Sequence, residues 1–258
     1  MNVVRRVHDV RAALEPHRAA VSRIALVPTM GAFHDGHLAL FRAARSECEV
    51  VVVSLFVNPA QFGDAGDLAT YPHEEERDAR LAREAGVDLL FAPSDDEVYP
   101  EGFQTWVDVE RLGQMLEGEF RPGHFRGAAT VCLKLFNIVR PHVAYFGQKD
   151  AQQVEVIRRM IRDLDLDLEL EVVPTVRDPD GLALSSRNVR LGPEERERAL
   201  TLPRALATGD PERARAMLDD VEVDYVAVAP FDPPVLAAAV RIGSVRLIDN
   251  MPLEGDTA

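Results

Sequence analysis

Short apolar runs alternate along the first two thirds of the chain with longer stretches whose apolar residues recur at helical spacing. The runs are four to eight residues long, which suits strands better than helices. We predict strands at 24–28, 50–57, 89–92, 143–146 and 168–173, and helices at 38–45, 74–84, 127–139 and 151–164. This alternation is typical of α/β proteins and predicts a Rossmann-like, doubly wound parallel sheet.

The pattern changes after Asn188, where two helical stretches precede three strand-like stretches that have no helices between them. We predict helices at 193–207 and 211–218, and strands at 221–228, 235–242 and 245–249. Consecutive strands without crossover helices indicate a small α+β unit. The sequence therefore predicts two domains, a catalytic α/β domain at 1–188 and a small C-terminal domain at 189–258.

Composition and charge narrow the class of protein. A hydrophobic fraction of 47% over 258 residues is enough for a substantial core, and the two cysteines, Cys48 and Cys132, lack metal-ligand spacing. The net charge of −14 argues against general binding to nucleic acid or to anionic membranes. No signal peptide and no run of 18 apolar residues is present, so we expect a soluble, cytoplasmic protein.

In open α/β sheets, ligands bind beyond the carboxyl ends of the strands, so the loops after the strands are the places to look for chemistry. The first predicted strand is followed by Met30-Gly31-Ala32-Phe33-His34-Asp35-Gly36-His37 and then by an apolar helix. Two imidazoles at a helix N-terminus, beside glycines that admit a close ligand, suit the phosphates of a nucleotide. The alternative is a pair of surface or capping histidines without a ligand, and zinc binding is disfavoured because no further ligand has suitable spacing.

Three other loops carry polar side chains that would be unremarkable alone. Asn58 and Gln61 follow the second predicted strand, and Gln61 could bind hydroxyl and carboxylate groups or merely cap its own loop. Gly147-Gln148-Lys149-Asp150 precedes a helix that bears Gln153. This segment could bind phosphate through Lys149 and magnesium through Asp150, or it could be a solvent-exposed turn without a ligand. Leu184-Ser185-Ser186-Arg187 could close over phosphates, although serine-rich turns are common.

Taken together, these motifs resemble the pantoate–beta-alanine ligase (pantothenate synthetase) family of the H-x-G-H nucleotidyltransferase superfamily. The resemblance spans residues 24–188 and includes P-T-M-G-x-x-H-x-G-H, F-V-N-P-x-Q-F, Tyr71-Pro72, R-P-G-H-F-R-G at 121–127, K-L-F-N-I-V at 134–139, F-G-Q-K-D and S-S-R-N. It implies that pantoate and ATP, with Mg²⁺, form pantoyl adenylate, from which beta-alanine displaces AMP. It also implies a homodimer and a hinged C-terminal lid.

The resemblance implies a role for each site residue. His34, His37, Lys149 and Arg187 would be catalytic, acting on the ATP phosphates, and His37 would donate a proton. The ATP site would comprise Met30, Gly31, Ala32, Phe33, His34, Asp35, Gly36, His37, Gly147, Gln148, Lys149, Asp150, Val176, Leu184, Ser185, Ser186 and Arg187. Gln61 and Gln153 would bind pantoate with Asn58 nearby, Gln61 would also reach beta-alanine, and Asp78 and Asp150 would lie near magnesium.

The chain departs from the family pattern in two places. His73 stands where an arginine is usual, and the C-terminal unit is shorter than usual, with the deletion placed near 207–211. Two alternatives therefore stay open: a nucleotidylyltransferase of the same superfamily, and a nucleotide-binding protein that has lost catalysis with its shortened lid. The apolar residues Val131, Leu133, Leu135 and Phe136 could serve a dimer interface or the core of the chain.

Overall fold

The computed structural model describes residues 1–63 and 65–253, which form two compact units. The N-terminal unit contains Met1–Phe146 and Val156–Val173, and the C-terminal unit contains Gly147–Glu155 and the chain from Pro174 onward. The second unit thus begins earlier than the expected boundary at residue 188. The reason lies in packing, because Leu182 is buried in the hydrophobic cluster of the C-terminal unit and Arg177 forms an ion pair with Asp249.

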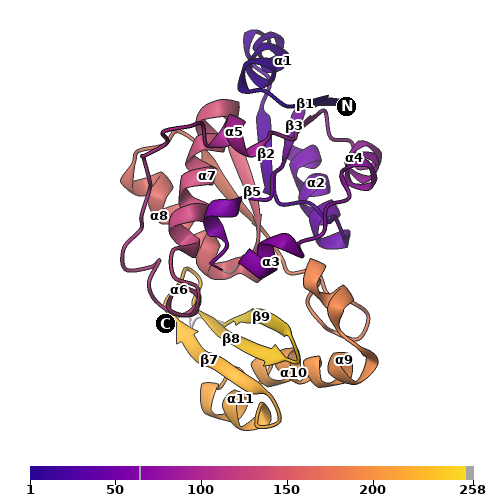
Figure 1. Ribbon diagram of the computed structural model, residues 1–258, viewed down its shortest axis with the longest axis vertical. Coiled ribbons are helices and arrows are strands. Elements are labelled where there is room, and N and C mark those ends of the chain that lie inside the picture. Colours follow the sequence, from indigo (N-terminus) through magenta and orange to yellow (C-terminus); the bar gives the residue numbers. More distant parts are fainter. Residues whose placement is uncertain (64, 254–258) are drawn as a thin grey trace. The chain divides into compact units, whose positions relative to one another are not determined.

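A six-stranded sheet forms the centre of the N-terminal unit (Figure 1). Its strands lie in the order β1-β4-β3-β2-β5-β6, and the pairs β1/β4, β4/β3, β3/β2 and β2/β5 are parallel. The strands are β1 (Asn2–Val4), β2 (Ile24–Thr29), β3 (Val50–Leu55), β4 (Leu89–Phe91), β5 (Val143–Gly147) and β6 (Glu169–Val173). The order reverses between β2 and β5, which confirms the doubly wound fold and marks the place where such sheets bind ligands.

Helices cover both faces of this sheet, with α2 and α4 on one side and α7 and α8 on the other (Figure 1). The helices are α1 (Val7–Ala19), α2 (Asp35–Glu47), α3 (Ala65–Ala69), α4 (Glu75–Glu84), α5 (Asp95–Val98), α6 (Glu117–Phe120), α7 (His124–Val139) and α8 (Ala151–Asp163), with a 3-10 turn η1 (Pro59–Gln61). The sequence missed β1 and α1. A three-residue strand is too short to show an alternation of apolar and polar residues. Helix α1 buries only Val10 and Leu14, so its apolar periodicity is weak.

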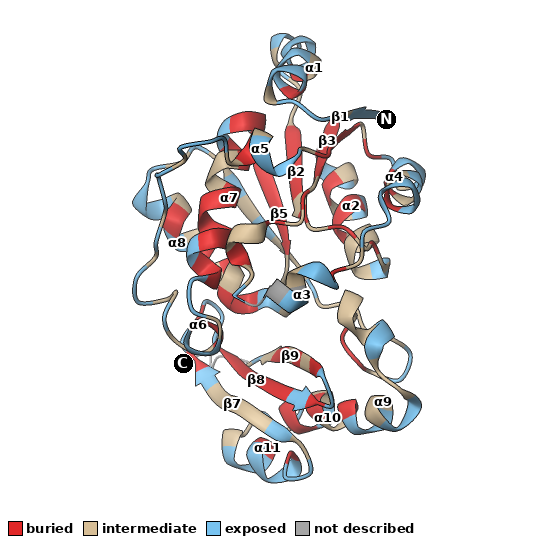
Figure 2. Ribbon diagram, in the orientation of Figure 1, coloured by how far each residue is buried: buried red, intermediate tan, exposed pale blue. Residues whose placement is uncertain are grey.

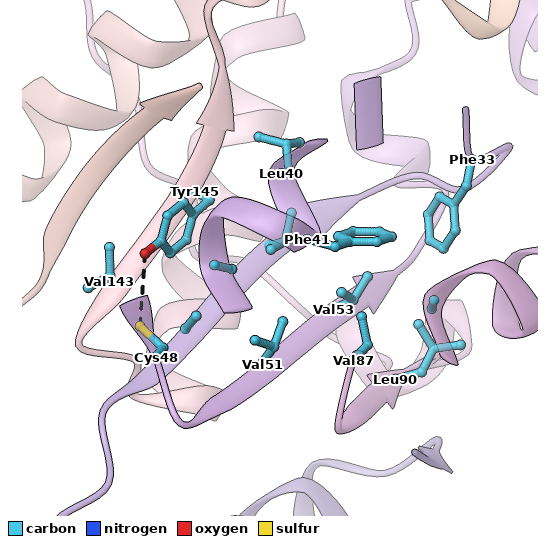
Figure 3. Close-up of a cluster of buried hydrophobic side chains, with 14 residues drawn as sticks. Phe33, Leu40, Phe41, Cys48, Val51, Val53, Val87, Leu90, Val143 and Tyr145 are labelled. Carbon is cyan, nitrogen blue, oxygen red and sulfur yellow. Dashed lines mark hydrogen bonds between the residues drawn. The ribbon is translucent and has the colours of Figure 1, made fainter. Parts of the chain in front are cut away.

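Alternate residues of the central strands point to opposite faces of the sheet, as the pleat requires. On the α2 side, Val51 and Val53 of β3 pack against Phe41 and Tyr145, and Phe33 from the loop after β2 joins the same cluster (Figure 3). Both faces of the strands are buried, which is why β2 and β3 are continuous apolar runs (Figure 2).

The C-terminal unit contains an antiparallel sheet in the order β7-β8-β9. Its elements are η2 (Gln148–Asp150), η3 (Ser186–Arg190), α9 (Pro193–Ala199), α10 (Thr201–Leu206), α11 (Pro211–Met217), β7 (Glu222–Ala229), β8 (Val235–Ile242) and β9 (Val245–Pro252). The single helix expected at 193–207 is divided into α9 and α10. Pro203 cannot donate the backbone hydrogen bond that would join the two helices through Ala199.

Within the described residues, no helix has the length and the apolar character needed to cross a bilayer.

Candidate active site

The loop after β2 is held in an unusual conformation by one buried carboxylate. Gly31 and Ala32 both have positive φ angles, +88° and +54°. The backbone N–H groups of Ala32 and Phe33 each donate to one oxygen of Asp78, at 2.7 and 2.8 Å. A Cβ at Gly31 would lie 2.6 Å from the end of the Leu55 side chain and 3.0 Å from Asp78 Oδ2, and the positive φ angle favours glycine at this position.

Asp78 therefore anchors this loop, and its expected place near magnesium stays a prediction. Its side chain is 1% exposed, and each carboxylate oxygen already accepts a backbone hydrogen bond. Burial raises the pKa of the Asp78 carboxyl, while the two backbone donors oppose that shift.

His34 and His37 cap the N-terminus of α2 through a reciprocal pair of hydrogen bonds. The Gly36 N–H donates to His34 Nδ1 at 3.2 Å, and the His34 N–H donates to His37 Nδ1 at 3.3 Å. An Nδ1 that accepts a hydrogen bond carries no proton, so each neutral ring holds its proton on Nε2. The two rings lie 4.2 Å apart between centroids, so the helix start presents two neighbouring Nε2–H donors.

The rest of this motif supports the two histidines. Phe33 is buried and packs edge-on against Phe41 with ring centroids 5.1 Å apart, so its side chain belongs to the core, and its ring centroid lies 5.3 Å from that of His37 (Figure 3). Gly36 supplies the capping N–H, Asp35 is exposed at the first turn of α2, and Met30 is half-buried. Of the residues expected to contact ATP, Phe33 and Gly31 can therefore contribute through the backbone alone.

The amide pair after β3 lies beside this loop. The Gln61 Nε2 amide donates to Met30 Sδ at 3.3 Å, which joins the loops that follow β2 and β3. Asn58 Nδ2 donates to Gln61 Oε1 and to the Gly127 carbonyl, at 3.0 and 3.2 Å, and Asn58 Oδ1 accepts from Tyr99 Oη at 2.7 Å. Asn58 is thus saturated and positions Gln61, whose amide donates, among the residues that the structure describes, to a weak sulfur acceptor.

The R-P-G-H-F-R-G motif supports the same turn from α7. His124 Nδ1 donates to the Gln61 carbonyl at 2.9 Å, and Arg121 donates to His124 Nε2 at 3.1 Å. Gly127 lies against η1 so closely that a Cβ there would be 2.3 Å from the Ala60 carbonyl oxygen. The sequence assigned no role to Tyr99 or His124. Their partners lie 41 and 63 residues away, so no local pattern could reveal them.

In the C-terminal unit, η2 carries the cation expected to meet phosphate. Lys149 is one of only two lysines in a chain with 29 lysines and arginines, the other being Lys134. Its side chain is 20% exposed, with Nζ 3.8 Å from Asp150 Oδ1. The Gln148 side chain donates to Asn250 Oδ1 at 3.0 Å, so this amide joins η2 to β9. A compact ammonium on a flexible stem can follow phosphate oxygens as charge moves among them.

The serine and arginine motif forms a capped turn in the same unit. Ser185 Oγ accepts from the Arg187 N–H at 3.2 Å and begins η3, and Asn188 Nδ2 donates to the Ala183 carbonyl at 3.0 Å. The Leu184 N–H donates to the Val176 carbonyl at 3.0 Å, so these two predicted residues lie together. Ser186, Arg187, Gly147 and Gln153 are half-buried. Sequence reasoning assigned no role to Asn250, Asp249 or Arg177, which hold this region in place.

The described residues offer no group of three or more histidine, cysteine, aspartate or glutamate side chains suited to a metal ion. Asp150 is the expected magnesium neighbour that keeps accessible oxygens, with a side chain 51% exposed. A single accessible carboxylate fits Mg²⁺, which binds through substrate phosphates, waters and one or two carboxylates.

Comparison with known proteins agrees with these motifs over nearly the whole chain. A family model described as pantoate-beta-alanine ligase matches residues 2–252. A pantothenate synthetase from Heliobacterium modesticaldum is 50% identical, with 98% of this chain and 100% of that protein covered. The alignment spans 280 positions against 258 residues here, so at least 280 − 258 = 22 positions have no counterpart in this chain.

Solved structures lead to the same family. The pantothenate synthetase from Thermus thermophilus has a TM-score of 0.91 at 46% identity, covering 98% of this chain and 99% of that one. The pantoate-beta-alanine ligase from Francisella tularensis, solved in complex with beta-gamma ATP and beta-alanine, has a TM-score of 0.87 at 35% identity, covering 98% and 97%. This agreement favours the ligase over the nucleotidylyltransferase alternative. The chain belongs to the pantoate–beta-alanine ligase family.

Proposed function

We propose that this chain condenses pantoate with beta-alanine in two steps at the residues described above. In the first step a pantoate carboxylate oxygen attacks the α-phosphorus of ATP, the bond from that phosphorus to the bridging oxygen breaks, and pyrophosphate leaves. In the second step the beta-alanine amine attacks the acyl carbon of pantoyl adenylate, the carbon–oxygen bond to AMP breaks, and the amine loses a proton as the amide forms.

The observation that carries this proposal is the orientation of the two histidines at the start of α2. Both Nδ1 atoms accept backbone hydrogen bonds, so His34 and His37 offer Nε2–H donors at the positive end of α2. Negative charge grows on the departing pyrophosphate, and preorganised donors stabilise such charge more strongly than mobile water does. We assign both imidazoles to the ATP phosphates as hydrogen-bond donors.

We assign pantoate to Gln61 and Gln153, and beta-alanine to Gln61 as well. The Gln61 amide has a weak acceptor in Met30 Sδ, so a carboxylate or hydroxyl oxygen could replace it at little cost. Asn58 keeps the Gln61 amide oriented. The remaining nucleotide contacts belong to the loop after β2 and to the residues around Lys149, Val176 and Arg187, as the resemblance implies.

We further assign Lys149 and Arg187 to the phosphates and Asp150 to magnesium. A bound Mg²⁺ would neutralise phosphate charge, and Asp150 would hold it through coordinated water because its carboxylate is exposed. In a chain with a net charge of −14, Lys149 and Arg187 would supply local positive charge for the phosphates.

The test is ATP–pyrophosphate exchange with Mg²⁺, with and without pantoate, followed by beta-alanine. We expect exchange only when pantoate is present, and release of AMP and pantothenate after beta-alanine is added. Exchange without pantoate would indicate a different acceptor, and no exchange at all would support the nucleotide-binding protein without catalysis.

We also propose a homodimer, on the resemblance alone. Val131, Leu135 and Phe136 are buried within a single chain, and Leu133 is half-buried, so the first three belong to its own core. Size-exclusion chromatography with light scattering should give about twice the chain mass of 28.5 kDa. A mass that stays at one chain across concentrations would reject the dimer.

A further inference from the structure

One buried asparagine of the small sheet is devoted to the turn that carries Lys149. Asn250 on β9 is 3% exposed, and its Nδ2 donates to the backbone carbonyls of Gln148 and Lys149, at 3.0 and 2.9 Å. Its Oδ1 accepts from Gln148 Nε2 at 3.0 Å. Both hydrogens and the oxygen of this amide are therefore used to hold η2, although about 100 residues separate the two segments in sequence.

The residue before it holds the second candidate phosphate-binding segment. Asp249 is buried and accepts two hydrogen bonds from Arg177, at 2.6 and 3.1 Å. Arg177 forms a β-bridge with Ala183, and Asn188 Nδ2 donates to the Ala183 carbonyl. The turn bearing Arg187 therefore continues directly from a hairpin that is fastened to Asp249.

The two residues are also linked by a local hydrogen bond between a backbone N–H and a side chain. Asp249 Oδ1 accepts the Asn250 backbone N–H at 2.8 Å, which fixes the orientation of the dipeptide on β9. An asparagine and a carboxylate adjacent on one strand normally point to opposite faces, so one dipeptide can hold two different segments. The Lys149 turn and the Arg187 hairpin are thus anchored to the same two residues.

We propose that Asp249 and Asn250 are positioning residues that set Lys149 and Arg187 in register for a single phosphate chain. This inference rests on the proposed function, since it assumes that both cations act on the phosphates. A flexible lysine is useful in catalysis only if its backbone is fixed, and a misplacement of about 1 Å can cost about 100-fold in rate. Neither residue needs to touch the substrates.

The decisive variant is Asn250→Asp, which keeps the size of the side chain but replaces the two donated hydrogens with an oxygen facing two carbonyls. We expect pyrophosphate exchange to fall by up to about 100-fold in the wild-type background. In a Lys149→Ala background the same substitution should lower the rate far less, because the group being positioned is already gone. Asn250→Ala should behave in the same way.

Asp224→Asn provides the matched control within the same small sheet. Asp224 is also a buried carboxylate that accepts from two arginines, Arg241 and Arg246, at 3.1 and 2.6 Å, but it does not hold a candidate phosphate-binding segment. We expect this variant to lose some thermal stability and to keep its exchange rate. Equal losses of activity in Asp224→Asn and Asn250→Asp would mean that Asn250 is merely structural.

Hydrogen exchange followed by mass spectrometry tests the inference without relying on activity. In Asn250→Asp the backbone amides of 147–150 should exchange faster, while in Asp224→Asn they should match wild type. Unchanged protection at 147–150, or a rate loss equal in the wild-type and Lys149→Ala backgrounds, would overturn the proposal. Absence of exchange activity in the wild-type protein would instead reject the proposed function, and the protection data would still decide the inference.

Discussion

At the scale of single residues, backbone contacts decide which atoms can do chemistry. The H-x-G-H motif does not say which ring nitrogen of His34 or His37 carries the proton. In the structure each Nδ1 accepts a backbone hydrogen bond, which leaves Nε2 as the nitrogen that can donate. Asp78 differs from the histidines, since both of its carboxylate oxygens accept backbone N–H groups of the loop after β2. The capping role and the phosphate role of the histidines are therefore compatible, because they use different nitrogens.

Lys149→Ala should lower turnover by about 100 to 1000-fold, since it removes a donor to the departing phosphate. Steady-state kinetics with saturating pantoate and beta-alanine would measure the loss. Lys134→Ala is the matched control, because Lys134 lies over the Phe103 ring at 4.8 Å and is not assigned to a substrate. Near wild-type turnover in Lys149→Ala would contradict the assignment.

His37→Ala should cost about the same factor, 100 to 1000-fold. His37→Asn separates the two roles of this residue, because the asparagine oxygen can accept the His34 N–H while no imidazole donor remains. We expect thermal stability to recover in His37→Asn while turnover stays low. Recovery of both would show that His37 acts only as a helix cap.

Burial raises the pKa of the Cys132 thiol to about 12, from an ordinary value of 9.0. We expect iodoacetamide at pH 8 to leave Cys132 unmodified in the native protein and to label it in urea, as read by peptide mass spectrometry. The thiol favours folding while it is protonated, so this contribution to stability is complete below pH about 9 and is lost as pH rises toward 12. Rapid labelling of native Cys132 would contradict the burial.

At the scale of elements, the candidate pantoate site depends on how closely α7 approaches η1. Gly127 lies inside α7, where alanine would ordinarily favour the helix by about 0.5 to 1 kcal/mol. Here a Cβ would lie 2.3 Å from the Ala60 carbonyl oxygen and 2.7 Å from the Gln61 nitrogen. The conflict between local preference and packing marks this contact as one that tertiary structure imposes.

Gly127→Ala should therefore push η1 and Gln61 outward, raise the KM for pantoate and lower the free energy of unfolding by about 1 to 3 kcal/mol. Pantoate titrations in the exchange assay and urea unfolding would measure the two effects. Asn137→Ala is the control, because it adds helix propensity at an exposed position of the same helix. An unchanged KM for pantoate in Gly127→Ala would separate Gln61 from pantoate.

At the scale of the whole molecule, each unit has a hydrophobic cluster of its own. The cluster of the N-terminal unit lies between the parallel sheet and α2, and that of the C-terminal unit lies between the antiparallel sheet and α9, α10 and α11. In the C-terminal unit, 207–210 joins α10 directly to α11. The shorter chain thus keeps a complete small sheet with its covering helices, which is why we propose that it retains the family's activity.

Leu206→Ala should destabilise the C-terminal unit, since Leu206 is fully buried in its cluster. The expected loss in free energy of unfolding is about 2 to 5 kcal/mol. Hydrogen exchange should report faster exchange in β8 with little change in β3, because β3 belongs to the other cluster. Equal changes in both strands would indicate that the two clusters unfold as one.

The sequence by itself determined the alternation of strands and helices, the motif loops at the carboxyl ends of the strands, and the family. Apolar periodicity and short motifs are local, so residues such as His34, Gln61 and Lys149 can be selected as candidates from their neighbours in the chain. Only tertiary structure decided which partners these side chains have and how each one is held. Asp78 and Asn58 are occupied by partners far away in sequence, and Asn250 gains its role from a turn about 100 residues away. Such contacts depend on strand order and helix packing, and no local pattern records them.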